Sequence, residues 1–383
     1  MFLSLNSLGI IISIICAFLT LFYVGLLLFF SRGWVRLPKF KRIEKSYKTK
    51  VSIIIAARNE EQNIASTIDD ILRQSYPKEH YELIIVDDHS TDKTAEIVKS
   101  YQSESVRLIQ LNEPDVLNSY KKKAITEAIK NSSGELIVTT DADCSMGPKW
   151  LETVINCYEQ NHFKMISSPV SYFREKNEFE EMQTLEFLFL IGLGASGIGN
   201  KMPTTCNGAN LAYQREAFLE VGGFQGIDNL ASGDDELLLH KMTFKYPNAI
   251  GFCKSEDAIV YTEAKENLQE FISQRKRWAS KSTRYKDKRI VFVAVSIWLF
   301  NVSFLFNFVS VFFEAYALKV FLFQYLVKML VEVFFLSKIT SFNKRIELLK
   351  YIPILSLIHP LYIVYIGLAG NSGKYKWKGR TVR

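Results

Sequence analysis

Two aspartates one residue apart, Asp141 and Asp143, follow the hydrophobic run Leu136–Val138. Side chains alternate between the two faces of a strand, so both carboxylates point the same way if the extended backbone continues past Thr140. Two carboxylates on one side of a strand end can bind a hard divalent cation, which in turn can bind phosphates. Such a pair also occurs as a plain polar strand end, and the other motifs must decide between these interpretations.

Polar side chains also follow two other hydrophobic runs. Asn59–Glu60 come after residues 51–57, and Asp87–Asp88 end residues 81–88. Hydrophobic runs about 30 residues apart, with a helical pattern between them, are typical of β-α-β units in a parallel sheet. The carboxyl ends of parallel strands meet at one edge of a sheet, where ligands bind. We therefore expect these groups and the Asp141/Asp143 pair to form one site.

The residues between these groups predict the elements that position them. Strands are expected at 51–57, 81–88, 106–111 and from 135 onward, and helices at about 60–73, 93–101 and 122–130. This alternation predicts an α/β fold with an open, mostly parallel sheet.

Two downstream motifs add further candidates. Asp234 and Asp235 open a predicted helix, where one of them is expected only to cap the free N–H groups. Gln274, Arg277 and Trp278 are spaced i, i+3 and i+4 and share a helix face. Arg277 can then contact a diphosphate while Trp278 stacks on the ligand. Alternatively, these three residues end a basic amphipathic helix beside a membrane.

The composition indicates a membrane-associated protein rather than a nucleic-acid-binding protein. Of the 383 residues, 48% are hydrophobic, and 28 are Phe. The five cysteines are scattered, which argues against a disulfide framework and a structural zinc site. The net charge of +7 comes from basic residues beside apolar segments, so an anionic membrane surface explains it better than nucleic acid.

The N-terminal segment is a predicted membrane anchor. Residues 1–30 carry no charge, and the apolar segment from about Leu8 to Phe30 is long enough to cross a hydrocarbon core of roughly 30 Å. It lacks the basic start and the cleavage site of a signal peptide. A basic stretch with a single acidic residue, Glu44, follows. By the positive-inside rule this stretch is cytoplasmic and the N-terminus lies outside.

Three later segments, Ile290–Phe313, Ala317–Leu336 and Tyr351–Leu368, are also long enough to cross a membrane. The second contains Lys328 and Glu332, four residues apart, which are expected to neutralise each other. Four crossings that start outside would leave the basic C-terminal tail outside as well, against the positive-inside rule. The last segment is interrupted by two prolines, and we expect it to be re-entrant or to lie at the interface.

The stretch Gly192–Gly197 has the spacing of a dinucleotide-binding loop, G-x-G-x-x-G. It follows a predicted helix at 179–191 rather than a strand, and no acidic residue lies about 20 positions further on, so we exclude a dinucleotide site. The Phe/Leu-rich helix is instead expected to be amphipathic, to end flexibly and to lie at the bilayer surface.

Taken together, the motifs resemble those of inverting family-2 glycosyltransferases, which have the GT-A nucleotide-sugar-binding (Rossmann-like) fold. The residues that carry the resemblance, in the family's order, are Val51–Glu60, Val86–Asp92, Lys121–Lys122, Asp141–Asp143, Asp234 and Gln274/Arg277/Trp278. The last motif is similar to that of ceramide glucosyltransferases and processive polysaccharide synthases. Trp377–Arg380 is similar to a motif of membrane-bound members.

The resemblance implies a role for each position. The nucleotide-binding residues would be Ala56, Ala57, Arg58, Asn59, Glu60, Asp88, Lys121, Lys122, Asp141, Gln274, Arg277 and Trp278, with Asp88 at the uracil edge. Asp143, together with Asp141, would bind Mg²⁺ or Mn²⁺ on the diphosphate, and Asp234 would be the general base. The family usually has an acidic residue at the position of Gly233, so Asp235 is a second candidate for the base.

We therefore interpret the chain as a multi-pass enzyme of the cell (inner) membrane with a cytoplasmic catalytic domain. It would be a hexosyltransferase that moves one sugar, with inversion, from a UDP-sugar to a lipid or lipid-linked acceptor. The alternatives are a processive polysaccharide synthase and a nucleotide-sugar sensor without turnover. The expected parts are an anchor (1–31), a basic linker (32–50), a GT-A domain (51–288), membrane segments (289–370) and a basic tail (371–383).

Overall fold

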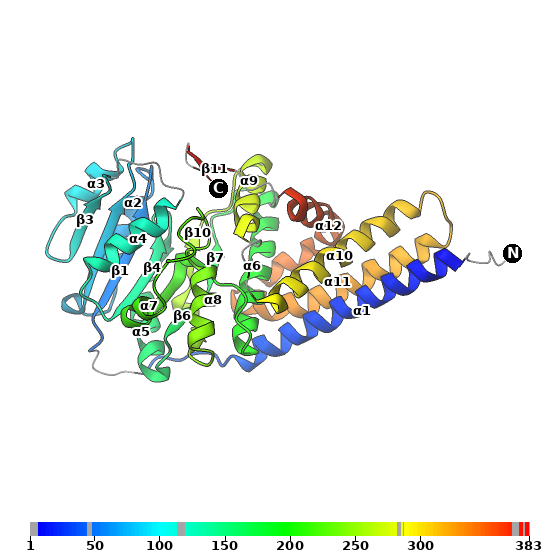
Figure 1. Cartoon of the computed structure of the whole chain (residues 1–383), viewed down its shortest axis with the longest axis horizontal. Coiled ribbons are helices and arrows are strands. Elements are labelled where there is room, and N and C mark those ends of the chain that lie inside the picture. The colour runs from blue at the N-terminus through cyan, green and yellow to red at the C-terminus, as the bar shows by residue number, and fades with distance from the viewer. Residues whose placement is uncertain are drawn as a thin grey trace. The chain divides into compact units, whose positions relative to one another are not determined.

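The computed structural model describes residues 7–43, 48–112, 119–281, 285, 287–369, 375–377 and 380–382. The chain divides into two compact units, each built from two separate stretches of sequence (Figure 1). The sheet unit comprises Gly33–Asn267 and Lys374–Arg383, and the helical unit comprises Met1–Arg32 and Leu268–Gly373.

Within the described residues, a seven-stranded sheet with the order β3-β2-β1-β4-β8-β6-β9 forms the centre of the sheet unit (Figure 1). Its strands are β1 Val51–Ala57, β2 Tyr81–Asp87, β3 Val106–Gln110, β4 Leu136–Asp141, β6 Met165–Ser167, β8 Leu211–Gln214 and β9 Ile250–Phe252. Strands β3, β2, β1 and β4 are parallel, whereas β8 runs antiparallel to β4 and β6. The prediction of an open, mostly parallel sheet is confirmed.

Hydrophobic residues on strands and helices form the interior of this unit. Residues 51–55 of β1 are all buried, because both faces of the sheet are covered. On α2, Ile64, Ile68 and Ile71 are buried and recur with the period of a helix. The helices are α2 Ile64–Leu72, α3 Thr94–Ser100, α4 Tyr120–Lys130, α5 Trp150–Asn161, α6 Glu178–Gly199, α7 Arg215–Glu220 and α8 Glu236–Lys245, with short 3₁₀ turns η1 Lys78–His80, η2 Gly208–Asn210 and η3 Glu256–Ala258.

The sheet unit also contains a second, three-stranded sheet with the order β5-β10-β7. Its strands are β5 Ser145–Met146, β10 Val260–Thr262 and β7 Val170–Tyr172, and α6 packs on β7. The Gly192–Gly197 stretch lies within α6, which agrees with the exclusion of a dinucleotide site. The expectation of a flexible end was wrong, because the helix continues to Gly199 and buries both its leucine-rich middle and its glycine-rich end. A position of this helix at the bilayer surface stays a prediction.

Close helix packing explains why positions 33 and 199 are occupied by glycine. A Cβ atom on Gly199 would lie 2.1 Å from the carbonyl oxygen of Gly33, and one on Gly33 would lie 2.1 Å from that of Ser196. These distances are far below a van der Waals contact. The last turn of α1 (Ser7–Arg36) and the end of α6 therefore meet because both positions lack a side chain.

The helical unit contains most of α1 together with α9 Leu268–Ala279, α10 Lys288–Ser310, α11 Ala317–Phe342, the 3₁₀ turn η5 Ile346–Tyr351 and α12 Ile352–Ala369. In the described residues, α1, α10, α11 and the segment Ile346–Ala369 are long and apolar enough to cross a membrane, and so is α6 of the sheet unit. This confirms one N-terminal and several C-terminal candidate membrane helices.

One sequence expectation differs from the helical unit. The predicted interruption of the last segment is wrong, because α12 continues through Pro360, and Pro353 occupies the first turn, where no N–H is needed. The helix α9 belongs to this unit and packs on α12, with the rings of Phe271 and Tyr362 5.5 Å apart. The predicted bounds of the domains stay predictions.

A buried polar cluster links three helices of this unit. Lys328 Nζ lies 2.6 Å from Glu332 Oε1, so the predicted neutralisation of this pair is confirmed. Tyr23 on α1 donates to the same oxygen at 2.6 Å, and Ser356 on α12 donates to Glu332 Oε2 at 3.0 Å. The charged groups of Lys328 and Glu332 thus have partners on α11 itself and, for Glu332, also on α1 and α12.

Candidate active site

Three strand ends bring the predicted ligand-binding residues to one edge of the main sheet. In the parallel register, Ala57 of β1 pairs with Asp87 of β2, and Ala56 pairs with Asp141 of β4. The polar groups that follow these strands therefore start from the same level of the sheet. Their predicted meeting at one edge is confirmed.

At this edge Lys121, in the first turn of α4, links two carboxylates. Its Nζ lies 2.7 Å from Asp141 Oδ1 and 3.2 Å from Asp234 Oδ2. Burial lowers the pKa of Lys121, but the carboxylates of Asp141, Asp234 and Asp235 raise it by more, so the net pKa lies well above its ordinary value. The ammonium group therefore stays charged between a strand end and a helix start that are far apart in sequence.

Asp234 and Asp235 have different surroundings. Asp235 is the N-cap of α8: its Oδ1 accepts the N–H of Glu236 at 2.6 Å, and its Oδ2 accepts the N–H of Gly208 at 3.2 Å. Asp234 instead faces Lys121, with 13% of its side chain exposed. The charge of Asp235 also raises the pKa of Lys121, so both candidates for a general base lie near this lysine, and Asp235 in addition caps α8.

Two glycines shape the backbone around Asp234. Gly233 has φ of +85°, a left-handed conformation that a residue with a side chain adopts only with strain. A Cβ atom on Gly208 would lie 3.3 Å from Asp234 Oδ2 and 3.7 Å from Lys121 Nζ. The loop at 206–210 therefore keeps the space beside the charged cluster open.

The chain turns directly after Asp141. β4 ends at this residue, and the N–H of Cys144 donates to the carbonyl of Asp141 at 3.3 Å. The expectation that an extended backbone presents Asp141 and Asp143 on one face was therefore wrong. Burial, together with Asp143 and Asp141, raises the pKa of the Cys144 thiol, so this group stays protonated beneath the turn.

The donors at this turn suit a divalent cation that is completed by a ligand. Within the described residues, no group of three or more His, Cys, Asp and Glu side chains is arranged to hold a metal ion. Mg²⁺ is usually bound by one or two carboxylates, water and substrate phosphates rather than by a complete protein cage. Asp141 and Asp143 are carboxylates of this kind, and 38% of the Asp141 side chain is exposed.

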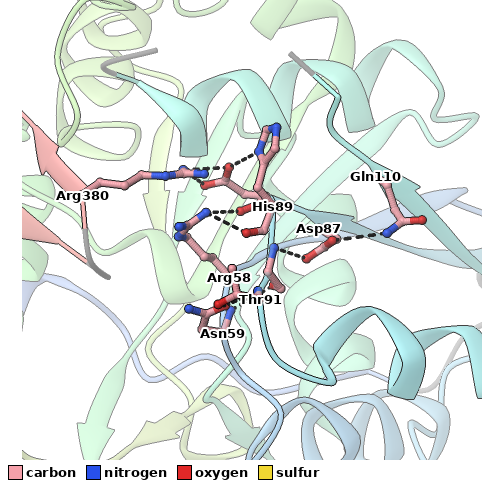
Figure 2. A network of polar contacts seen from close by, with 9 residues as sticks. Arg58, Asn59, Asp87, His89, Thr91, Gln110 and Arg380 are labelled. Atoms are coloured by element: carbon pink, nitrogen blue, oxygen red, sulfur yellow. Dashed lines mark hydrogen bonds and ion pairs between the residues drawn. The ribbon is translucent and has the colours of Figure 1, made fainter. Parts of the chain in front are cut away.

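Figure 2 shows the polar network at the end of β2. Asp87 supports the turn, because its Oδ1 accepts the N–H of Ser90 at 3.2 Å. The Asp88 side chain is 3% exposed, and each of its oxygens lies 2.9 Å from Nη1 of Arg380. Its Oδ1 also lies 3.0 Å from His89 Nδ1. Sequence reasoning missed Arg380 at this site, because its partner lies 292 positions away.

The predicted residues after β1 brace the same turn. Arg58 Nη1 donates to the carbonyls of Asp88 and His89 at 2.7 and 2.9 Å. Asn59 Oδ1 accepts the N–H of Thr91 at 2.8 Å, and the N–H of Glu60 donates to Thr94 at 2.8 Å (Figure 2 shows Asn59 and Thr91). These contacts give the turn a fixed shape. Nucleotide binding by residues 56–60 stays a prediction.

Lys122 lies behind the charged cluster. Its side chain is buried, and its Nζ donates to the carbonyls of Leu230 and Ser232 at 2.6 and 2.7 Å. These contacts fix the segment that leads into Asp234. A nucleotide contact of Lys122 stays a prediction, whereas its neighbour Lys121 lies in the cluster.

The Gln274/Arg277/Trp278 motif lies on α9, as predicted, in the helical unit. Gln274 Oε1 accepts a hydrogen bond from Arg275 Nη1 at 2.5 Å, and the Arg275 guanidinium lies 4.3 Å from the centroid of the Trp278 ring. Arg275 is 2% exposed and was missed by sequence reasoning, which considered only its neighbours. Contacts of the motif with a diphosphate stay predictions.

The order and direction of the strands in the main sheet define a GT-A-like α/β fold. The structure is similar to that of mannosyltransferase PcManGT from Pyrobaculum calidifontis, solved in complex with GDP-Man and Mn²⁺. The TM-score is 0.58 at 18% identity, and the similarity covers 91% of this chain and 99% of the other. At this identity, the likeness concerns the fold.

Residues 52–222 match the model of Glycosyl transferase family 2. It is 26% identical over 200 residues to glucosyl-dolichyl phosphate glucuronosyltransferase of Haloferax volcanii (50% of this chain, 61% of the relative). It is 27% identical over 276 residues to probable glycosyltransferase YdaM of Bacillus subtilis (67% and 63%). It is also 30% identical over 138 residues to beta-monoglucosyldiacylglycerol synthase of Nostoc sp. (34% and 30%). Each match spans less than two thirds of the relative.

Proposed function

We propose that this protein is a membrane-bound, inverting glycosyltransferase that moves one sugar from a UDP-sugar to a lipid or lipid-linked acceptor. The observation that carries the proposal is the position of Asp234, 3.2 Å from the Lys121 ammonium group, which also holds Asp141 at the sheet edge. One cluster thus combines a candidate base with groups suited to a diphosphate. Displacement of a nucleotide from a sugar needs both.

In the proposed reaction, Asp234 accepts the proton of the acceptor hydroxyl while its oxygen attacks the anomeric carbon. The bond between this carbon and the diphosphate oxygen breaks, and UDP leaves with the electron pair. Attack from the face opposite the leaving group inverts the anomeric centre. The Lys121 ammonium group is positioned to neutralise charge that develops on the diphosphate.

Asp143 and Asp141 would hold Mg²⁺ or Mn²⁺ in this proposal. The bound cation supplies further charge neutralisation for the leaving diphosphate. Asp88 would bind the uracil edge, and the backbone at 56–58 would lie beside it.

The names of relatives support a lipid-borne acceptor. They include the dolichyl phosphate enzyme of Haloferax volcanii and the diacylglycerol enzyme of Nostoc sp.. Another, from Methanococcus voltae, is named dolichyl N-acetyl-alpha-D-glucosaminyl phosphate 3-beta-D-2,3-diacetamido-2,3-dideoxy-beta-D-glucuronosyltransferase. The apolar helices of the helical unit would anchor the enzyme in the bilayer where such acceptors reside.

Membranes that contain the protein, supplied with radiolabelled UDP-sugars, test this function. We expect an organic-extractable product that carries one sugar, with UDP released in equal amount. Membranes with Asp234→Asn serve as the control and should give neither. A long water-soluble polymer would instead identify a processive synthase, and UDP-sugar binding without product would identify a sensor.

The C-terminal tail bears on the membrane topology. Arg380 of the tail pairs with Asp88, and both residues belong to the sheet unit. The tail and the catalytic domain would therefore lie on the same side of the membrane, which the positive-inside rule makes cytoplasmic. Because α10, α11 and α12 stand between them in sequence, one of these helices would not cross.

We assign this role to α12. It contacts α9 through Tyr362, whose ring is 5.5 Å from that of Phe271, and through Tyr365, whose ring centroid is 4.9 Å from Lys276 Nζ. The basic helix α9 is too highly charged to lie in hydrocarbon. Packing on α9 would hold α12 at the interface.

Single-cysteine labelling from outside the cell, in a cysteine-free background, checks this topology. Phe312→Cys, at an exposed position after α10, should react because it would lie outside. Arg32→Cys and Lys376→Cys should not react in intact cells and should react after permeabilisation. Labelling of Lys376→Cys in intact cells would show that α12 crosses.

A further inference from the structure

The last residues of the chain reach the proposed nucleotide site. Strands β11 Tyr375–Trp377 and β12 Arg380–Val382 form an antiparallel hairpin that belongs to the sheet unit. Arg380 extends from this hairpin to Asp88 (Figure 2). The Arg380 guanidinium also lies 3.6 Å from the centroid of the Tyr120 ring, at the start of α4.

This ion pair is largely shielded from water. The side chain of Asp88 is 3% exposed and that of Arg380 is 18% exposed. A carboxylate buried to this degree requires a counter-charge or several hydrogen bonds. Arg380 supplies the charge, and His89 Nδ1 supplies the other side-chain contact, at 3.0 Å.

The geometry of the pair leaves hydrogen-bonding capacity unused. Arginine carries five N–H donors and usually meets a carboxylate with two nitrogens in parallel. Here Nη1 alone contacts both oxygens of Asp88, and Nε and Nη2 have no hydrogen bond to any residue that the structure describes. Within the same residues, Asp88 Oδ2 accepts only the bond from Arg380. Donors without a protein partner, next to an acceptor with a spare lone pair, form a surface to which a polar ligand edge can bind.

We propose that Arg380 is a donor-binding residue that holds the nucleobase edge together with Asp88. This inference rests on the proposed function, in which Asp88 binds the uracil edge of the donor. The imide edge of uracil is an N–H group flanked by two carbonyl oxygens. Asp88 accepts the N–H, and the remaining donors of Arg380 bind a carbonyl oxygen. The Tyr120 ring supports the guanidinium plane by a cation–π contact.

A hairpin that only blocked the site would need to leave before the donor entered. The contacts favour shared binding instead, because neither Arg380 nor Asp88 is saturated by the pair. The turn that carries Asp88 is held independently by Arg58, which binds the carbonyls of Asp88 and His89. Asp88 therefore keeps its position whether or not the hairpin is in place. If Arg380 blocks the site, its removal should strengthen UDP binding, and if Arg380 binds the donor, its removal should weaken UDP binding.

Calorimetric titration of the full chain in detergent micelles tests the proposal with three probes. These are UDP, inorganic pyrophosphate, which lacks the base, and N3-methyl-UDP, which lacks the imide N–H. Arg380→Ala should weaken UDP binding about tenfold or more, as expected for hydrogen bonds from a charged group. Pyrophosphate binding should be unchanged. Wild type should bind UDP more tightly than N3-methyl-UDP, and Arg380→Ala should reduce this preference.

Two further variants separate the arginine from general effects of charge and folding. Arg380→Lys keeps the positive charge but not the planar set of donors, so UDP binding should lie between that of wild type and Arg380→Ala. Lys376→Ala removes one positive charge from the same hairpin at the position paired with Thr381, and should bind UDP as wild type does. Melting curves of each variant establish that the fold is retained.

Other outcomes overturn the proposal. Tighter UDP binding by Arg380→Ala would identify the hairpin as a plug. Unchanged UDP binding, or an equal loss for UDP and pyrophosphate, would leave Arg380 a structural role. Wild type that binds neither UDP nor pyrophosphate would overturn the proposed function along with this inference. Wild type that binds UDP while Arg380→Ala binds it equally well would overturn this inference alone.

Discussion

The two units each contain a lysine beside carboxylates, in very different settings. In the helical unit, the Lys328 side chain is 1% exposed and pairs with Glu332, whose oxygens also accept bonds from two hydroxyl groups. In the sheet unit, Lys121 is 21% exposed and is shared between Asp141 and Asp234 at 2.7 and 3.2 Å. The same chemical groups thus form a closed cluster in one unit and a partly open one in the other.

The two clusters differ in whether water or a ligand can reach their charged groups. A charge pair in an apolar bundle is tolerated only when each polar atom has a partner, because water cannot replace a lost one. A cluster at the open edge of a sheet can exchange partners with a ligand, since the aqueous solvent stabilises the intermediate arrangements. Substitutions in the two clusters should therefore affect different properties, turnover in one and stability in the other.

The largest effect is expected at Asp234. The variant Asp234→Asn is nearly isosteric but cannot accept the hydroxyl proton, so turnover should fall by roughly 10²–10⁴ with UDP affinity near that of wild type. Asp235→Asn is the matched comparison. Asparagine also caps a helix, but it keeps only one of the two oxygens that accept N–H groups, so turnover should fall much less than in Asp234→Asn. Steady-state rates and UDP calorimetry on both variants decide the assignment. The reverse pattern would make Asp235 the base.

Lys328 should give the opposite kind of result. Lys328→Met leaves Glu332 buried without its cation, which should reduce the free energy of unfolding by about 3–5 kcal/mol. The double variant Lys328→Met/Glu332→Gln removes both charges and keeps a partner for the hydroxyls of Tyr23 and Ser356, so most of the loss should be recovered. Chemical denaturation in detergent measures this. A single variant as stable as wild type would contradict the closed character of the cluster.

The metal-binding prediction concerns the open cluster again. Asp143→Ala should abolish the part of UDP binding that depends on Mn²⁺, a loss of about tenfold or more, because one carboxylate ligand is removed. Chelation of the metal in wild type should have the same effect. Glu216→Ala, at an exposed position on α7, is the control. Calorimetry with UDP, with and without Mn²⁺, distinguishes the outcomes, and unchanged metal dependence in Asp143→Ala would contradict the assignment.

Much of the fold could be predicted because it depends on local patterns. The hydrophobic runs at β1, β2 and β4 and the helical patterns between them specify parallel strands, and parallel strands bring their carboxyl ends together. The positions of Asp88, Lys121 and Asp141 at one edge follow from that rule.

The features that the sequence did not reveal depend on tertiary contacts. The turn after Asp141 forms although the preceding residues favour an extended strand, and α12 continues through Pro360 although proline disfavours a helix interior. The pairs Arg380–Asp88 and Arg275–Trp278 involve arginines that any surface or membrane-flanking segment also contains. Charge alone cannot predict which arginine becomes buried against a distant or neighbouring partner.

The smallest expected effect concerns Lys254, a buried lysine that contacts no carboxylate in the described part of the chain. Its Nζ donates to the carbonyls of Trp34 and Leu37 at 2.7 and 3.0 Å, and lies 4.3 Å from the centroid of the Trp34 ring. Burial, and then the charge of Lys39, lower the pKa of Lys254 from 10.5 to about 8. Unlike Lys121 and Lys328, Lys254 is therefore stabilised by carbonyl dipoles and an indole ring rather than by a carboxylate.

The sign of the pH dependence follows from these two pKa values. Below pH 8 Lys254 is charged in the folded and unfolded states, and folding carries the full cost of burying the charge. Between pH 8 and 10.5 the unfolded state binds the proton and the folded state does not, so the free energy of unfolding rises with pH. The carbonyls and the indole ring favour the charged form, which limits the expected gain to about 1 kcal/mol.

Denaturation of the wild type and of Lys254→Met across this pH range measures the effect. Because other groups titrate in the same range, the informative quantity is the difference between the two proteins, and Lys245→Met, at an exposed lysine paired with Glu220, provides the control. We expect Lys254→Met to gain less stability between pH 8 and 10.5 than either of the others. Identical pH profiles would show that the carbonyls and the indole ring hold the charged ammonium as well as the carboxylates hold that of Lys121.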